Sequence, residues 1–190
     1  LLIIIIKEWL MKVSIVIINF NTKNMTEQCI KSIISSTKCE FEIIVVDNSS
    51  KLEEKFSSDL PFVKVINAEN KGFGHACNIG MRDSCGDFYL MLNSDTIVHD
   101  YAIDTCLEYI SEHSNVGAIG CRTMLVDGTL DHNCKRGLPT PEASLYYLLG
   151  LDKKYPNSPK YARYHATFLD ENKINEVEVL SGSFMMLRAS

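Results

Sequence analysis

The chain has 190 residues, of which 46% are hydrophobic and 23% are charged, and its formal net charge at pH 7 is −5. This size and composition are those of a single globular domain with a proper core. The acidic balance, with no basic run to offset it, argues against a nucleic-acid polymer as partner, although a small nucleotide needs only local donors.

The cysteines and the N-terminal segment bear on the cellular compartment. The 7 cysteines are scattered, without a Cys-x-x-Cys pair or zinc-ligand spacing, so we expect reduced thiols in a cytoplasmic protein. Residues 1–6 are apolar, but a bilayer span needs about 20 residues, and the basic flank and cleavage site of a secretory signal are absent. Residues 1–12 are predicted to be an N-terminal extension. The chain begins without Met and ends inside a strand-like segment, which predicts a fragment.

Apolar runs that predict buried strands alternate with helical patterns. Strands are predicted at residues 13–18, 43–46, 62–66, 88–92 and 116–121. Helices are predicted to run from a cap at Asn24 to about Ser36, from Lys51 after a cap at Ser50, from the glycine-rich run to about Ser84, and from a cap at Asp100. The last of these carries a core stripe of Ile103, Cys106, Leu107 and Ile110. This alternation predicts an α/β fold with right-handed βαβ units and a mainly parallel sheet.

The regular pattern dissolves in the last third of the chain. A hairpin turn is predicted at residues 126–129. Prolines and tyrosines between residues 131 and 175 predict an irregular lobe with at most short helices, which is usually functional or mobile. Strand character returns at residues 177–187, where Ser181, Gly182 and Ser183 interrupt it.

Polar residues follow three of the predicted strands, at residues 19–21, 47–49 and 93–95. In a parallel sheet the carboxyl ends of the strands meet at one edge, where open α/β folds bind ligands. Any one of these clusters could be a helix cap or a turn. Three together favour a site.

Asp95 is the strongest candidate for a metal ligand at this edge. Magnesium or manganese usually takes one or two carboxylates and completes its shell with substrate phosphates. Asp87 precedes the same strand and is expected at its opposite end. Asp47 has two open interpretations: it accepts hydrogen bonds from a nucleobase or ribose, or it caps the helix after Ser50.

The glycine-rich run at residues 71–80 would let backbone approach a ligand, with helix N–H groups facing anionic phosphate. Lys71 would neutralise phosphate or is simply solvated. Cys77 stands where the third glycine of a dinucleotide fingerprint would be, so that motif is a poor match. His75 either faces the crevice or, as we favour, packs the helix. No Gly-x-Ser-x-Gly nucleophile elbow is present in the sequence.

Five segments, spread over nearly the whole chain after residue 12, match the motifs of one known family in order. They are residues 14–21, 43–50, 70–80, 92–96 and 181–186. With them the chain resembles the family 2 glycosyltransferases of the GT-A fold, and among these the bacterial rhamnosyltransferase-like enzymes. Two positions depart from the family pattern. Ile18 replaces a common Pro, and Asn93 stands for the first acid of the DxD-type metal motif, a variant common in that branch.

The resemblance implies a Rossmann-like three-layer sandwich. Residues 13–130 would form the nucleotide-sugar-binding part, and residues 131–190 an acceptor-side lobe and returning strand of the same domain, incomplete at the C-terminus. Asp95 would hold Mn²⁺ or Mg²⁺, and Ser181, Gly182 and Ser183 would border the acceptor. The implied nucleotide-sugar-binding residues are Asn19, Phe20, Asn21, Asp47, Lys71, Gly72, Phe73, Asn78, Asn93, Ser94 and Asp95.

The implied activity is an inverting, metal-assisted transfer of a sugar from a nucleoside-diphosphate donor to a glycan or lipid-linked acceptor. The rhamnosyltransferase-like motifs favour dTDP-rhamnose, although UDP sugars fit the same motifs. By analogy the enzyme would serve polysaccharide biosynthesis for the cell envelope, in the cytoplasm and at the inner face of the cell membrane. The family's catalytic base is an Asp or Glu downstream of the Ser181–Ser183 strand. It is expected beyond Ser190, so no catalytic residue is assigned.

Two other functions stay open. A sugar-phosphate nucleotidylyltransferase usually carries a Gly-rich, Arg-containing loop after its first strand, but residues 19–22 contain neither Gly nor Arg. A non-catalytic module that binds a nucleotide or glycan would explain the missing base. The sequence beyond Ser190 would separate this module from the enzyme.

Overall fold

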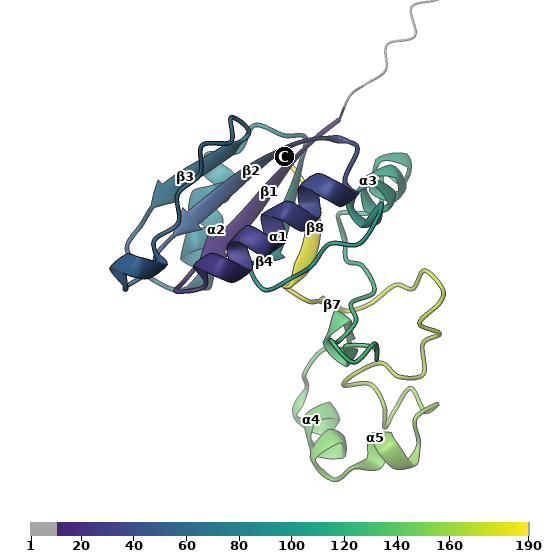
Figure 1. The fold of residues 1–190 in the computed structure, drawn as a ribbon. Coiled ribbons are helices and arrows are strands. Elements are labelled where there is room, and N and C mark those ends of the chain that lie inside the picture. Colours follow the sequence, from purple (N-terminus) through teal and green to yellow (C-terminus); the bar gives the residue numbers. More distant parts are fainter. Residues whose placement is uncertain (1–10, 190) are drawn as a thin grey trace, which may run out of the picture. The chain divides into compact units, whose positions relative to one another are not determined.

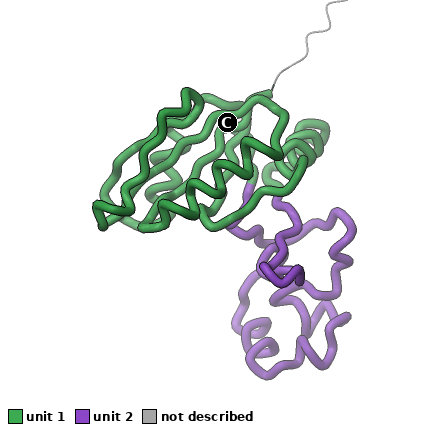
Figure 2. Tube along the Cα trace, viewed as in Figure 1, with its two compact units in different colours: residues 1–119, 186–190 green, residues 120–185 purple. Residues whose placement is uncertain are grey.

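A computed structural model of the chain describes residues 11–189, which form two compact units (Figure 2). The first unit contains residues 11–119 and 186–189, and the second contains residues 120–185. Residues 1–10 of the predicted extension lie outside the described residues. Lys12, predicted to belong to that extension, is the first residue of strand β1.

The first unit is built on a six-stranded sheet with the order β3-β2-β1-β4-β8-β5 (Figure 1). The pairs β1–β2, β1–β4 and β2–β3 are parallel, and β5–β8 is antiparallel. Helices α1 and α2 cover opposite faces of this sheet (Figure 1). The α/β fold with a mainly parallel sheet is therefore confirmed. The strands are β1 (Lys12–Asn19), β2 (Glu40–Asp47), β3 (Val63–Asn67), β4 (Phe88–Asn93), β5 (Ala118–Ile119) and β8 (Phe184–Arg188).

Three α-helices and a 3-10 turn connect these strands. They are α1 (Lys23–Ser36), the 3-10 turn η1 (Leu52–Glu54), α2 (Phe73–Arg82) and α3 (Ala102–Glu112). The central strand β1 is apolar without alternation because both of its faces are covered, and Val13, Ile15, Val16 and Ile17 are fully buried. The predicted stripe of α3 is buried as well. Among residues 11–189, no helix is both long and apolar enough to cross a bilayer.

The predicted helix caps are wrong. Helix α1 begins at Lys23 rather than Asn24, because a carboxylate oxygen of Glu54 accepts the Lys23 N–H at 3.1 Å. The side chain of Ser50 does not cap the following 3-10 turn. Helix α3 begins after Tyr101, whose left-handed backbone (φ 61°) places it, and not Asp100, in the cap position.

The second unit has little regular structure, as predicted for most of its length. The short strands β6 (Lys135–Arg136) and β7 (Val179–Leu180) pair antiparallel. The remaining elements are a 3-10 turn η2 (His132–Cys134) and the helices α4 (Pro141–Leu148) and α5 (Leu151–Lys154). The predicted hairpin turn is confirmed by an isolated antiparallel bridge between Met124 and Leu130. The strand predicted at residues 116–121 is shorter, since only β5 pairs.

Candidate functional site

The carboxyl ends of the central parallel strands meet at one edge of the sheet, as predicted. In the register of β1 and β2, Asn19 is the partner of Asp47, and in that of β2 and β3, Asp47 is the partner of Asn67. On the other side of β1, Ile18 is the partner of Asn93. The three polar clusters therefore follow neighbouring strands within two residues of the same level.

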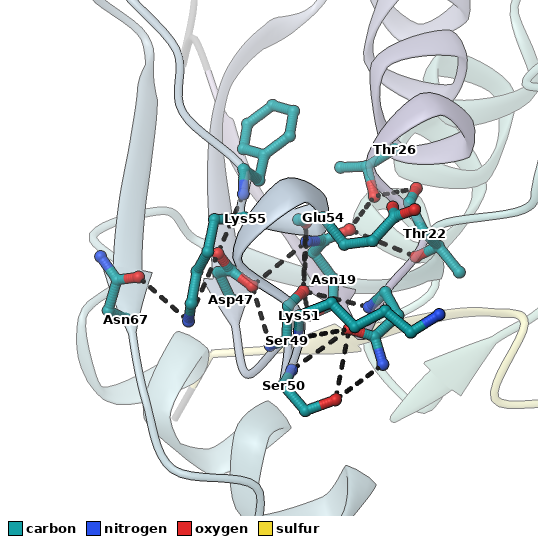
Figure 3. Close-up of polar contacts among 12 residues, drawn as sticks. Asn19, Thr22, Thr26, Asp47, Ser49, Ser50, Lys51, Glu54, Lys55 and Asn67 are labelled. Atoms are coloured by element: carbon teal, nitrogen blue, oxygen red, sulfur yellow. Dashed lines mark hydrogen bonds and ion pairs between the residues drawn. The ribbon is translucent and has the colours of Figure 1, made fainter.

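Asn19 is the centre of a buried hydrogen-bond network at this edge (Figure 3). Its amide nitrogen lies 3.1 Å from Asp47 Oδ1, 2.8 Å from Ser49 Oγ and 2.9 Å from the Glu54 carbonyl oxygen. Its amide oxygen accepts hydrogen bonds from the hydroxyls of Thr22 and Thr26. One side chain thus connects the end of β1 with the loop after β2 and the first turn of α1.

Asp47 uses both carboxylate oxygens inside the protein. Oδ1 accepts the Ser49 N–H at 2.9 Å in addition to the Asn19 amide, and Oδ2 accepts the Phe56 N–H at 2.9 Å. The ammonium group of Lys55 is 3.8 Å from Oδ2. Burial raises the pKa of Asp47, but the hydrogen bonds from Ser49, Phe56 and Asn19 outweigh it and lower the pKa. The carboxylate therefore shapes the loop at residues 48–56, and a contact with a nucleotide stays a prediction.

Hydrogen bonds connect the loop after β1 to the loop after β2. Asn21 has a left-handed backbone (φ 56°), and its N–H donates to Ser49 Oγ at 3.0 Å. The amide oxygen of Asn21 accepts the backbone N–H groups of Ser50 and Lys51. Between these anchors Phe20 is 44% exposed. The predicted aromatic residue is thus a solvent-facing ring on a rigid frame.

The end of β4 forms a tight turn that presents Asp95. The Thr96 N–H donates to the Asn93 carbonyl oxygen at 3.2 Å, and the Cys29 thiol of α1 donates to the same oxygen at 3.6 Å. The hydroxyls of Ser94 and Thr22 are 3.0 Å apart. Burial of the Cys29 thiol, with a smaller contribution from the charge of Asp95, raises the pKa of Cys29 to about 12. Asp95 is exposed and, within residues 11–189, makes no hydrogen bond or ion pair.

A continuous chain of hydrogen bonds runs from Asp47 through Asn19 and Thr22 to Ser94. It fixes three strand ends relative to one another. The sequence pattern predicted Asn19, Asp47 and Ser94 at this edge but missed Thr22. A hydroxyl residue three positions after a strand-ending Asn is the signal that was available.

The donor set at this edge fits a hard divalent cation held by one carboxylate. Within the described part of the chain, no group of three or more His, Cys, Asp or Glu side chains gathers to hold a metal. Asp95 is the one carboxylate on the β4 turn, and the residue is exposed. Magnesium and manganese commonly bind through one or two carboxylates and take their other ligands from substrate phosphates and water.

The glycine-rich run enters α2 at the same edge, because α2 follows the carboxyl end of β3 and leads back to the start of β4. Gly72 precedes the helix with φ 95°, a conformation that favours glycine. Phe73 is 51% exposed. The exposed ammonium group of Lys71 pairs with Glu69 at 3.0 Å, so it lies at the surface. Asn78 is exposed on the second turn of the helix.

The other predicted residues lie elsewhere. Asp87 accepts the Lys12 N–H at 2.9 Å, which places it at the opposite end of β4 as expected. Ser181 and Ser183 belong to the second unit, where their hydroxyls are 2.8 Å apart.

Residues 14–187 match the family model described as "Glycosyl transferase family 2". The chain belongs to this family. It is 30% identical over 114 residues to the glycosyltransferase GlyG of Streptococcus pneumoniae, an alignment that covers 57% of this chain and 38% of GlyG. It is 29% identical over 110 residues to an uncharacterized glycosyltransferase of Haemophilus influenzae, covering 56% of this chain and 37% of that protein. The chain therefore matches well under half the length of these relatives.

Two solved structures share the fold. The chain aligns with residues 1–349 of TarS from S. aureus with a TM-score of 0.52 and 23% identity, over 70% of this chain and 40% of TarS. The structure of TarS with UDP-GlcNAc aligns with a TM-score of 0.51 and 19% identity, over 83% of this chain and 53% of that one. These likenesses agree with the GT-A fold that the sequence motifs implied.

Proposed function

We propose that this chain is the donor-binding part of a glycosyltransferase that moves a sugar, with inversion, from a nucleoside diphosphate to a glycan or lipid-linked acceptor. The observation that carries the proposal is the sheet edge where three strand ends, held together by hydrogen bonds, lie beside Asp95, a carboxylate without a hydrogen-bond or ion-pair partner among residues 11–189. Membership of glycosyl transferase family 2 supports it. The nucleotide sugar named with the TarS structure supports the class of donor.

In this proposal the buried network is a scaffold and the exposed residues bind the donor. Asn19, Asn21 and Asp47 hold the loops after β1 and β2 in place, so the Phe20 ring and the backbone of residues 48–51 face the nucleoside. The N-terminal turn of α2 offers the backbone N–H groups after Gly72 to the diphosphate. Lys71 exchanges its exposed partner Glu69 for a phosphate oxygen, a low-cost exchange because surface ion pairs are weak.

Asp95 would hold Mn²⁺ or Mg²⁺, with Asn93 and Ser94 beside it on the same turn. The cation, when bound, neutralises negative charge on the departing nucleoside diphosphate. The chain contributes a turn fixed by Cys29 and Thr22, so the Asp95 carboxylate meets the cation without rearranging.

The finer features of the proposal rest on the motifs. The donor is dTDP-rhamnose or a UDP sugar, and residues 181–183 border the acceptor. The enzyme works in the cytoplasm, at the inner face of the cell membrane, in polysaccharide biosynthesis for the cell envelope. The general base is assigned to none of the residues described.

A titration of dTDP, UDP and GDP, each with and without Mn²⁺, tests the donor site. We expect one nucleotide to bind saturably with Mn²⁺, and Asp95→Ala to weaken that binding about tenfold or more because it removes the carboxylate ligand proposed for the cation. Asp59→Asn is the matched control, since Asp59 is an exposed carboxylate in the loop before β3 and should leave binding unchanged. Undiminished Mn²⁺-dependent binding by Asp95→Ala would contradict the metal assignment.

A further inference from the structure

The second unit contains a pocket of about 330 Å³, within the size range of small-molecule sites. We name it the Arg136 pocket. It is lined by β6, by the segments that carry Arg163 and Phe168, and by residues 176–178 before β7. All of these residues belong to the second unit (Figure 2). The pocket is therefore a feature of this unit alone.

One wall of the pocket is a closed ion pair. The guanidinium group of Arg163 donates to both carboxylate oxygens of Glu178, with Nε 3.1 Å from Oε2. The Leu138 N–H donates to the same Oε2 at 2.9 Å. A Cβ atom on Gly137 would lie 2.5 Å from the Arg163 carbonyl oxygen, so only glycine fits between these groups. This wall has no charge left to offer a ligand.

Among residues 11–189, Arg136 and Glu176 are the charged side chains of the pocket that have no hydrogen-bond or ion-pair partner. Arg136 makes no ion pair within residues 11–189, and its Nε is buried without a hydrogen-bond acceptor. Buried donors are nearly always satisfied in native proteins, so this guanidinium group calls for an acceptor from outside the chain. The exposed carboxylate of Glu176, also without a partner in the described residues, adds acceptors only.

The rest of the lining is apolar. It includes the ring of Phe168 and the side chains of Pro159, Leu169 and Val177. The four charged side chains of the lining, Arg136, Arg163, Glu176 and Glu178, sum to zero formal charge. A phosphate or carboxylate ligand would bind beside Arg136 but would be repelled by Glu176. A ligand with both donors and acceptors and with one apolar face matches the pocket better.

We propose that the Arg136 pocket binds a neutral sugar residue of the acceptor glycan, an inference that rests on the proposed glycosyltransferase function. The hydroxyls of a sugar both accept from a guanidinium group and donate to a carboxylate, and its C–H face packs on an aromatic ring. Arg136, Glu176 and Phe168 supply these three contacts. Specificity for the acceptor would then reside partly in the second unit.

The test titrates the whole chain with methyl glycosides of neutral hexoses and N-acetylhexosamines. Saturation-transfer NMR, without nucleotide or metal, measures the binding. We expect saturable binding of at least one glycoside. Arg136→Met and Glu176→Gln should each weaken it about tenfold, since each removes a charged hydrogen-bonding group. Arg122→Met is the matched control, because Arg122 is an arginine of the same unit that pairs with Glu171 outside the pocket. The affinity of Arg122→Met for the glycoside should stay within about twofold of that of the parent protein.

Chemical modification of the unaltered protein gives a second readout that does not depend on the folding of variants. The bound glycoside should protect Arg136 from phenylglyoxal and leave Arg122 as reactive as before. The proposal is overturned if no glycoside binds, if Arg136→Met binds as well as the parent, or if inorganic phosphate protects Arg136 and the glycosides do not. Nucleotide titrations of Asp95→Ala, run in parallel, test the donor site alone, so failure of one site is distinguished from failure of the other.

Discussion

Asn19 shows at the scale of one residue why the candidate site is rigid. Its amide group is fully buried and donates a hydrogen bond from β1 to the carboxylate of Asp47. Asn19→Asp would replace that donor with a second carboxylate about as close to Asp47 as the 3.1 Å contact of the amide. We expect a loss of about 2–4 kcal/mol in the free energy of unfolding at pH 7.

The loss in Asn19→Asp should depend on pH. The new carboxyl would have a raised pKa in the folded state, so the variant is destabilised progressively as pH rises above the unfolded pKa of about 4. Urea denaturation at pH 4 and pH 7 measures this change. The control is Asn24→Asp, which places the same charge at an exposed position in the first turn of α1, where it is tolerated. Equal stability of the two variants at pH 7 would refute the role of Asn19.

Glu42, at the opposite edge of the sheet, also makes the stability of the protein depend on pH. Burial raises the pKa of Glu42, but hydrogen bonds from the Ser14 hydroxyl, the Cys85 N–H and thiol, and the Lys12 ammonium outweigh it and lower the pKa to about 2. The folded pKa is below the unfolded one. The stabilisation is therefore complete above about pH 4.5 and is lost as pH falls through about 2.

Glu42→Gln should lower the free energy of unfolding at pH 7 and flatten its decline between pH 4.5 and 2. Glu40→Gln, at the exposed first position of the same strand, should leave that decline unchanged. Chemical denaturation across this pH range gives the measurement. If the free energy of unfolding of the parent and of Glu42→Gln declined equally between pH 4.5 and about 2, the Glu42 contacts would contribute nothing to stability.

The residue types at the site were predictable, but their partners were not. A strand-ending Asn or Asp at the edge of a parallel sheet indicates a site from sequence alone. The contact from Asn19 to Glu54 joins residues 35 positions apart and exists only once β1 and β2 have paired. The sequence therefore left Asp47 open between a nucleotide contact and a helix cap, and did not reveal the buried donors Asn19, Ser49 and Phe56 that bind its carboxylate.

At the scale of the element, α2 packs on the sheet through a glycine. A Cβ atom on Gly80 would lie 2.3 Å from Val16 Cγ1, so the helix could not stay this close to β1. Gly80→Ala should destabilise the protein by about 1–3 kcal/mol through overpacking. Adding Val16→Ala should recover part of that loss, and a double-mutant cycle by urea denaturation measures the coupling.

Gly74 provides the control within the same helix. A Cβ atom there would meet nothing within 4 Å, and its backbone is compatible with alanine. Gly74→Ala should therefore stabilise the protein by up to about 1 kcal/mol, because alanine has the higher helix propensity. If both glycine variants lose equal stability, the helix–strand contact at Gly80 is not the cause.

Elements were predictable where their signal is local. The strands β1, β2 and β4 contain apolar runs because helices cover both faces of the sheet, so their sequences indicated buried strands. The apolar stripe of α3 indicated a helix with one buried face. The helix starts were missed because a cap can come from a distant residue. The first turn of α1 is capped by Glu54, a residue of the 3-10 turn after β2. No pattern around Asn24 carries that information.

At the scale of the whole molecule, the chain leaves the sheet after β5 and returns to it in β8. The sequence predicted an irregular lobe and a returning strand, but the boundaries of the second unit at residues 120 and 185 are set by contacts. The antiparallel pair joins Ala118 to Leu187 and Ile119 to Met186. The two points where the second unit is attached to the first are thus neighbours across one ladder.

This proximity predicts that the first unit folds without the second. Residues 121–183 replaced by a Gly-Ser linker of about four residues would close β5 and β8 as a hairpin, with little loop-closure entropy. We expect one cooperative thermal transition and a Mn²⁺-dependent nucleotide affinity within about threefold of the parent, because every strand end of the donor edge lies in the first unit.

The same linker in place of α1 is the contrasting deletion. It should abolish cooperative unfolding, since the helix buries Cys29, Ile30 and Ile33. Differential scanning calorimetry compares the two deletions, and binding of the glycosides should be lost only with the second unit. A broad, non-cooperative transition in the 121–183 deletion would mean that the sheet requires the second unit to fold. If the 121–183 deletion unfolds cooperatively and binds nucleotide, donor recognition resides in the first unit alone.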